Sequence, residues 1–336
     1  MGFVKYWAVR SGLASTVLSV AFVAACSSTP TAPTPPPPPA SPPTLACVEG
    51  INRSTTNAGG MTLDFDTPPA TAGQGTVNVT CSPGSGSNFP IGTTEVTCTA
   101  TDSLSRTGTC SFNVTINKLP TLSKTKFLAY GDSITAGEVT VPLGSALIGA
   151  KAITKQVVVP SVAYPNVLLN TLRGRYAAQA SAIDVFNYGF GGERVDQARN
   201  RFFSALTATR PDVLLLMEGV NDIGIGENGA ASGAAAEIRF WVAEAKARGV
   251  RVFLATPTPG RPGGTKTIQT LFIVDYASRM RTVAAQEGVT LVDLYNLMLP
   301  DVQRYIGVDG VHPNEQGYAR IADLFFQAIQ AALEVR

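Results

Sequence analysis

Most of the chain, from about residue 122 to residue 336, alternates short apolar segments with amphipathic helical patterns, and this alternation constrains the fold more than any other feature. The strand candidates are residues 126–130, 183–188, 213–217, 250–255 and 289–294. Gly249 and Gly288 stand where helices are expected to end, directly before the next strands. The alternation predicts an α/β domain with a parallel sheet covered by helices on both faces.

Polar residues with catalytic potential follow two of these strands, and a third group precedes the last helix. Gly-Asp-Ser occupies residues 131–133, Gly-Val-Asn-Asp residues 219–222, and Asp-Gly-Val-His-Pro residues 309–313, which include the single histidine of the protein. Ligands of such sheets gather beyond the carboxyl ends of the strands. Ser133 is therefore the candidate nucleophile, although Gly-Asp-Ser is also a common turn and helix N-cap.

Four blocks of this region resemble the signature blocks of the SGNH, or GDSL, hydrolase family, in the family's order. They are Gly-Asp-Ser-Ile at 131–134, Asn-Tyr-Gly-Phe-Gly-Gly-Glu at 187–193, Gly-Val-Asn-Asp at 219–222 and Asp-Gly-Val-His-Pro at 309–313. Ile134 stands where the family name has leucine. The resemblance implies a flavodoxin-like three-layer α/β/α domain over residues 122–336 that hydrolyses carboxylic esters and needs no cofactor.

The resemblance matches Ser133, Asp309 and His312 to the nucleophile, acid and base of the family's catalytic triad. The chemistry of these residues agrees, because a serine hydroxyl attacks well only when a neighbouring imidazole removes its proton. Asp309 can accept the Nδ1 proton of His312 and leave Nε2 facing Ser133. A capped loop with a satisfied histidine is the structural alternative for Asp309 and His312.

An oxyanion formed by attack on an ester needs preorganised hydrogen-bond donors. The predicted donors are the backbone N–H groups of Ser133 and Gly192 and the side-chain amide of Asn221; Gly192 and Asn221 match the family's oxyanion residues. Glycine suits position 192 because no Cβ obstructs the substrate. A plain loop glycine and a turn asparagine are the alternatives. Asp132 is expected to hold the loop by hydrogen bonds.

Other chemical classes find little support in the sequence. An ordinary α/β-hydrolase needs Gly-x-Ser-x-Gly, but Thr135 stands at the place of the second glycine. A single histidine cannot assemble a multi-histidine metal site, and no phosphate-binding loop is present. The formal charge of +2 gives no argument for a nucleic-acid partner.

Residues 46–118 have a different texture, in which short segments of alternating apolar and hydroxyl-bearing residues are separated by turns, as in a small all-β sandwich. The sequence of residues 89–102, with Cys-Ser-Phe at 110–112, resembles a hyalin-repeat (HYR) module, an immunoglobulin-like domain. We expect a spacer or adhesion unit.

Four of the five cysteines lie in this segment, and they are Cys47, Cys81, Cys98 and Cys110. Two disulfides are expected, which implies an oxidising compartment, but the sequence leaves all three connectivities open. Metal binding is the alternative, and the absence of a Cys-x-x-Cys pair argues against it.

The first residues read as an export signal. Lys5 and Arg10 precede an apolar core that ends at Cys26 and is too short to span a bilayer. The segment resembles a bacterial lipoprotein signal (residues 1–25) with Cys26 as the lipidated residue, and an ordinary secretory signal is the alternative. Residues 26–45 are rich in proline and are expected to form an extended linker. The prediction is a protein anchored by lipid at the cell envelope, with the outer membrane favoured.

The sequence does not choose the substrate. Family members include esterases, lysophospholipases, thioesterases and carbohydrate deacetylases. The apolar connection over residues 138–160 is either a lid or acyl-chain wall, or packing against a helix. We predict a serine esterase that acts through an acyl-enzyme on Ser133; the alternative is a surface adhesion protein with an inactive hydrolase-like scaffold.

Overall fold

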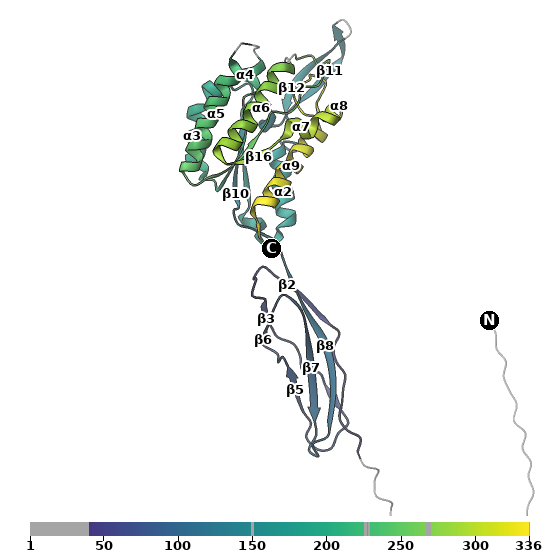
Figure 1. Cartoon of the computed structure of the whole chain (residues 1–336). Helices are drawn as coiled ribbons and strands as arrows, with labels where there is room; N and C mark the ends of the chain where they lie inside the picture. The colour runs from purple at the N-terminus through teal and green to yellow at the C-terminus, as the bar shows by residue number, and fades with distance from the viewer. Residues whose placement is uncertain (1–39, 149–150, 225–226, 228, 267–269, 336) are drawn as a thin grey trace, which may run out of the picture.

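The computed structural model describes residues 40–148, 151–224, 227, 229–266 and 270–335. Two domains lie end to end (Figure 1), and we call them the β module (residues 40–118) and the α/β domain (residues 121–335). The predicted signal peptide, the predicted lipidation site Cys26 and the linker up to residue 39 lie outside the described residues. None of the described helices is long and apolar enough to cross a membrane.

The β module is built around a four-stranded sheet in the order β2-β8-β7-β5, and the pair β3-β6 packs against its apolar face. A second pair, β1-β4, includes two residues of the predicted linker. In β7 the side chains of Val96, Cys98 and Ala100 are buried and the residues between them face outward, as the alternation predicted. The strands are β1 (Thr44–Leu45), β2 (Ile51–Thr55), β3 (Met61–Leu63), β4 (Ala70–Thr71), β5 (Asn78–Ser82), β6 (Ser87–Phe89), β7 (Gly92–Thr101) and β8 (Thr107–Lys118).

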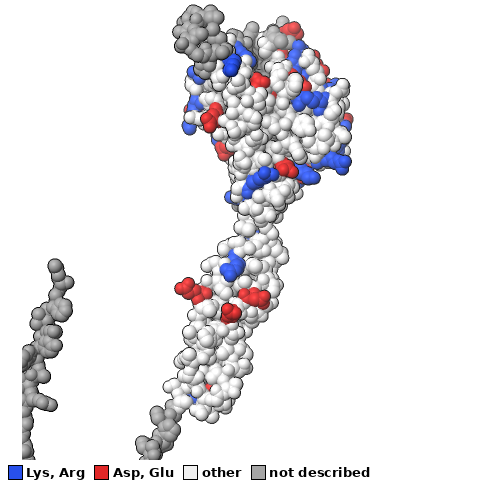
Figure 2. All heavy atoms as spheres, turned by 180° about the vertical axis from the view of Figure 1, so that it is seen from behind, with Lys and Arg blue, Asp and Glu red and all other residues white. Residues whose placement is uncertain are grey.

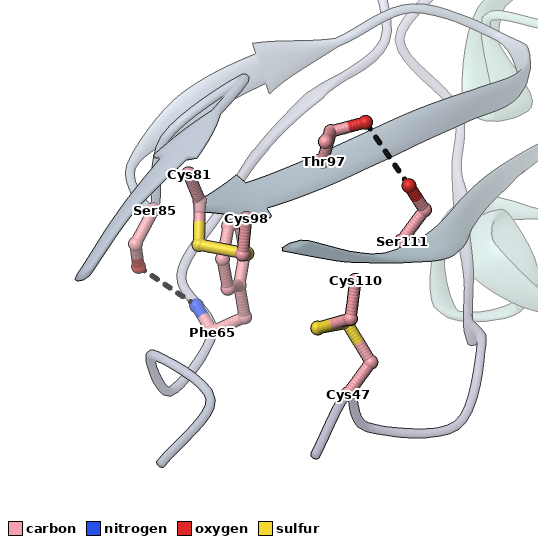
Figure 3. The surroundings of a disulfide bond; sticks show 8 residues. All are labelled: Cys47, Phe65, Cys81, Ser85, Thr97, Cys98, Cys110 and Ser111. Atoms are coloured by element: carbon pink, nitrogen blue, oxygen red, sulfur yellow. Dashed lines mark hydrogen bonds between the residues drawn. A yellow bond between two sulfur atoms is a disulfide. The ribbon is translucent and has the colours of Figure 1, made fainter. Parts of the chain in front are cut away.

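Two disulfides settle the connectivity that the sequence left open. Cys47 pairs with Cys110 and Cys81 pairs with Cys98 (Figure 3). The second bond joins residues that lie directly opposite each other in β5 and β7. The first ties the segment before β2 to β8, so both bonds brace the same sheet.

The α/β domain contains a five-stranded parallel sheet in the order β13-β10-β14-β15-β16. This is the flavodoxin-like order 2-1-3-4-5, in which the chain adds strands first on one side of β10 and then on the other. The strands agree with the five predicted segments to within two residues. They are β10 (Lys126–Gly131), β13 (Asp184–Gly189), β14 (Val213–Met217), β15 (Arg251–Ala255) and β16 (Thr290–Val292).

Helices cover both faces of the sheet, which confirms the three-layer prediction (Figure 1). One layer contains α2 (Tyr164–Arg175) and α9 (Glu315–Leu333); the other contains α3 (Val195–Thr209), α5 (Ala230–Ala247) and α6 (Thr270–Glu287). The shorter helices are α1 (Ser133–Ala136), η1 (Ala177–Ala182), α4 (Val220–Gly224), α7 (Leu294–Met298), η2 (Leu299–Asp301) and α8 (Val302–Tyr305).

The apolar connection after α1 forms a β-hairpin. Strands β11 (Glu138–Ile148) and β12 (Lys151–Val158) pair antiparallel and project beyond the main sheet at the end far from the β module (Figure 1). The sequence analysis did not predict this hairpin. It brings Glu138 and Gln156 close to the residues of the Asp309–His312 turn.

The two domains are joined by a short connection that is part of the α/β domain. Strand β9 (Thr121–Leu122) pairs antiparallel with β17 (Glu334–Val335), and Gln179 holds both backbone groups of Leu122 by hydrogen bonds of 2.7 and 3.1 Å. Figure 2 shows that charged side chains gather on the α/β domain, whereas the visible face of the β module carries few. The connection leads into the amino end of β10, so it lies at the edge of the sheet opposite the carboxyl ends of the strands.

Candidate active site

Ser133 is the first residue of α1, a one-turn helix directly after β10. Asp132 caps this helix, since its Oδ1 accepts a hydrogen bond of 2.9 Å from the backbone N–H of Ile134. The helix ends at Gly137 in the left-handed conformation that glycine adopts without strain. Burial raises the pKa of Asp132 to about 6. Asp132 therefore holds the nucleophile's turn, as expected from the sequence.

The structure brings the predicted triad together in one chain of hydrogen bonds. Ser133 Oγ lies 2.9 Å from His312 Nε2, and His312 Nδ1 lies 2.6 Å from Asp309 Oδ2. All three residues are buried, with exposed fractions of 4% for Ser133, 2% for His312 and 0% for Asp309. The histidine is thus oriented by the carboxylate on one side and faces the hydroxyl on the other.

Asp309 is kept as a carboxylate by its own turn. Although burial alone would raise its pKa, hydrogen bonds from His312 and from the backbone N–H of Val311 hold that pKa well below its ordinary value. Its backbone carbonyl accepts a hydrogen bond of 2.8 Å from the N–H of Lys266, and the carbonyl of Gly310 accepts one of 2.9 Å from Arg261. The segment 261–266 therefore fixes the turn from outside.

The two other predicted oxyanion residues follow β13 and β14, the neighbours of β10 on either side. Gly192 has φ +76°, a conformation that favours glycine, and a Cβ there would meet nothing within 4 Å. The Nδ2 group of Asn221 donates a hydrogen bond of 2.8 Å to the carbonyl of Glu193. Asn221 is therefore fixed beside the Gly192–Glu193 segment.

The loop after β13 also packs tightly against the nucleophile's helix. A Cβ at Gly189 would lie 1.9 Å from the backbone N of Ala136, so only glycine allows this approach. The N–H of Phe190 donates to the carbonyl of Gly131 at 3.0 Å. These contacts set the position of the Gly192 segment relative to Ser133.

Sequence reasoning missed a partly buried ionic network behind this loop. The guanidinium of Arg201 donates to the carboxylate of Glu193 and to the backbone carbonyls of Tyr188 (2.6 Å) and Gly131 (3.1 Å), and it lies 4.1 Å from the ring centre of Tyr130. One side chain thus links the carboxyl ends of β10 and β13. Its only sequence signal is a glutamate in the second block, eight residues before an arginine in α3.

Glu218, at the end of β14, is a second buried group that the sequence analysis did not single out. Burial, followed by the nearby charge of Asp132, raises its pKa well above the ordinary value. Its Oε1 accepts a hydrogen bond of 3.0 Å from the N–H of Gly219, and its Oε2 has no hydrogen-bond partner among the described residues. Burial therefore favours the neutral form of this carboxyl group over the charged one.

A pocket with a volume of about 360 Å³ lies on the outer side of the Asp309–His312 turn. Among the described residues that line this pocket are Gly310, which belongs to that turn, and Arg261, Lys266 and Tyr295. Among the described residues no group of three or more histidine, cysteine, aspartate or glutamate side chains could hold a metal ion.

Comparison with known proteins agrees with this geometry. The sequence model of the GDSL-like Lipase/Acylhydrolase family matches residues 129–320, and that of the HYR domain matches residues 39–116. An acetylxylan esterase of Xylanibacter ruminicola is 31% identical over 88 residues, which are 26% of this chain. The match spans 18% of that relative's length.

Two solved structures share the fold of the α/β domain. The lipase/acylhydrolase from Enterococcus faecalis superimposes with a TM-score of 0.51 at 21% identity, covering 62% of this chain and 97% of that one. An alpha/beta hydrolase enzyme from the metagenome of Lake Arreo superimposes with a TM-score of 0.50 at 22% identity, covering 62% and 96%. At these identities the likeness is one of fold.

Proposed function

The chain belongs to the GDSL-like lipase/acylhydrolase family, and from that premise we propose that it is an ester hydrolase in which Ser133 attacks the ester and carries the acyl group. The observation that supports this most strongly is the unbroken chain of hydrogen bonds from Ser133 through His312 to Asp309. His312 Nε2 takes the Ser133 proton as Oγ bonds to the acyl carbon. Asp309 stabilises the imidazolium that forms.

The tetrahedral oxyanion is held by the backbone N–H groups of Ser133 and Gly192 and by the amide of Asn221 in this proposal. Asn221 uses one N–H on the carbonyl of Glu193, and its NH₂ group carries a second donor for the oxyanion. The left-handed Gly192 exposes its backbone to the substrate without a Cβ. Such preorganised donors are worth most where water is excluded, and the triad is almost fully buried.

Collapse of the tetrahedral intermediate breaks the bond to the alcohol, which leaves after His312 returns the proton to its oxygen. Water then replaces the alcohol: His312 removes a proton from it, the hydroxyl adds to the acyl carbon, and Ser133 leaves with a proton from His312. No cofactor takes part in these steps.

For the substrate we propose an acetylated carbohydrate, because the curated relative is an acetylxylan esterase. The two disulfides favour an extracellular location. Lipid attachment at Cys26 stays a prediction. No observation favours the alternative of an inactive scaffold, since the triad atoms lie within hydrogen-bonding distance.

The test is Ser133→Ala, with Ser232→Ala on the exposed side of α5 as the matched control. We expect kcat/KM for 4-nitrophenyl acetate to fall by about 10⁴-fold or more in the first variant and to stay unchanged in the second. A fluorophosphonate probe should label the wild type and the control but not Ser133→Ala. Undiminished hydrolysis by Ser133→Ala would remove Ser133 from the mechanism.

A further inference from the structure

The carboxylate of Glu138 lies beside the triad, and no step of the mechanism uses it. Its Oε2 is 3.8 Å from His312 Nε2, the nitrogen that faces Ser133 Oγ. The other imidazole nitrogen, Nδ1, is hydrogen-bonded to Asp309. Glu138 therefore lies on the substrate side of the histidine.

The fold fixes the position of Glu138. It follows Gly137, which ends α1, and it begins β11, where it pairs with Val158. Its backbone carbonyl accepts a hydrogen bond of 2.5 Å from the hydroxyl of Tyr318. These contacts fix the backbone of Glu138, which is five residues after Ser133 in the sequence.

The carboxyl group also rests against the loop that carries Gly192. A Cβ built on Gly191 would lie 2.0 Å from Glu138 Oε1, so the carboxylate occupies the space that a side chain at 191 would need. Glu138 consequently lies between His312 and the predicted oxyanion loop, close to where an ester must enter.

No described side chain donates a hydrogen bond to this carboxylate, and none of the described lysines or arginines pairs with it. His312 Nε2, at 3.8 Å, is too distant to donate. The side chain is only 20% exposed, and carboxylates with so little exposure normally have donors or cations beside them. Because the described residues offer this carboxylate no donor, it is open to one from water or from a bound substrate.

We propose that Glu138 is a specificity-determining residue that accepts a hydrogen bond from a free hydroxyl of the substrate's alcohol portion, next to the ester under attack. This inference rests on the proposed function. A carboxylate only accepts hydrogen bonds, and charge-assisted bonds to hydroxyls are short and strong. Partly acetylated carbohydrates supply such hydroxyls, whereas a phosphate-bearing lipid headgroup would be repelled by the same charge.

The experiment compares three esters. The first is a methyl pentoside carrying one acetyl ester with free neighbouring hydroxyls, the second is the same ester with those hydroxyls methylated, and the third is 4-nitrophenyl acetate. Each is tested with the wild type, with Glu138→Gln and with Glu244→Gln, which removes one negative charge from the surface of α5. Melting temperatures establish that all three proteins are folded.

We expect Glu138→Gln to lower the wild-type preference for the free-hydroxyl ester over its methylated counterpart by about tenfold, because the amide oxygen still accepts a hydrogen bond but without the charge that strengthens it. Glu138→Gln should lose less activity on 4-nitrophenyl acetate than on the free-hydroxyl ester, and every value for Glu244→Gln should stay unchanged. An unaltered preference, or an equal loss on all three esters with a shifted pH profile, would overturn the inference, because Glu138 would then act on His312 or not at all. If the wild type hydrolysed none of the esters, the proposed function would fall with it.

Discussion

The β module and the α/β domain reach stability by different means. The core of the β module consists of a few buried side chains around Phe89, Val96 and Phe112, and two disulfides brace it. The α/β domain has one continuous core from β10 to α9 and no disulfide among its described residues. A small domain buries a smaller fraction of its surface than a large one, so covalent links can contribute a larger share of its stability.

The two domains also differ in the polar groups that they bury. The β module buries Asp102, which accepts hydrogen bonds from Arg106 and from backbone N–H groups. The α/β domain buries the triad and also Glu218, whose Oε2 is left without a partner among the described residues. The larger core thus holds several polar groups at a fixed geometry with water excluded, an arrangement that catalysis needs.

The largest expected effect tests whether catalysis belongs to one domain only. Asn221→Ala should lower kcat by about 10² to 10³-fold, the usual loss for one oxyanion donor. The matched change in the β module, Asn113→Ala on the exposed face of β8, should leave kcat unchanged. Steady-state kinetics on 4-nitrophenyl acetate measure both. A loss below about tenfold in the first variant would take Asn221 out of the oxyanion hole.

The second prediction separates the stabilities of the two domains. Replacing Cys47 and Cys110 together with alanine should lower the free energy of unfolding of the β module by about 2–5 kcal/mol. Replacing Cys81 and Cys98 should lower the free energy of unfolding by about 1 kcal/mol less than the first pair does. The reason is that this disulfide closes a loop of 17 residues, whereas the other closes one of 63. Calorimetry resolves the two melting transitions.

Hydrolysis of a small ester should be unaffected by either pair of substitutions. Loss of activity in parallel with the melting of the β module would show that the α/β domain depends on its neighbour.

The smallest expected effect is a pH dependence of opposite sign in the two domains. Burial raises the pKa of Glu218 in the folded state, so its contribution to stability is lost as pH rises above the unfolded value. Burial of Asp102 is outweighed by hydrogen bonds from Arg106, which lower its pKa to about 2, so its contribution is lost as pH falls from about 4 to about 2.

Glu218→Gln should accordingly raise the melting temperature of the α/β domain at pH 8 and change it little near pH 4. Thermal denaturation at both pH values measures the difference. An equal shift at the two pH values would mean that the side chain contributes through packing and not through its ionisation.

The strands of the α/β domain could be predicted to within two residues. Continuous apolar runs such as residues 213–217, which are buried throughout, are typical of strands in a parallel sheet covered on both faces. The contact between Ser133 and His312 followed from the only histidine in the chain. The hairpin β11–β12 could not be predicted, because its apolar residues are equally compatible with a lid or with packing. The Arg201 network was also missed, since an arginine in α3 gives no sign of the backbone carbonyls that it binds.

The pairing of the cysteines could not be predicted from the sequence either. The four cysteines predicted two disulfides, but only the register of β5 against β7 decides that Cys81 faces Cys98. Pairing depends on which residues become neighbours in a sheet, and that information is not local in the sequence.

The pairing of β9 with β17 places the attachment of the β module at the amino edge of the main sheet, whereas Ser133 opens at the carboxyl edge. The edge of the sheet that carries Ser133 therefore lies opposite the attachment of the β module. If the amino-terminal side of the chain is attached to a membrane, the β module acts as a spacer that sets how far from the membrane the α/β domain can reach. A longer or shorter spacer would then change which parts of a polymeric, immobile substrate the α/β domain can reach. The rate at which it hydrolyses small, diffusing esters would not change.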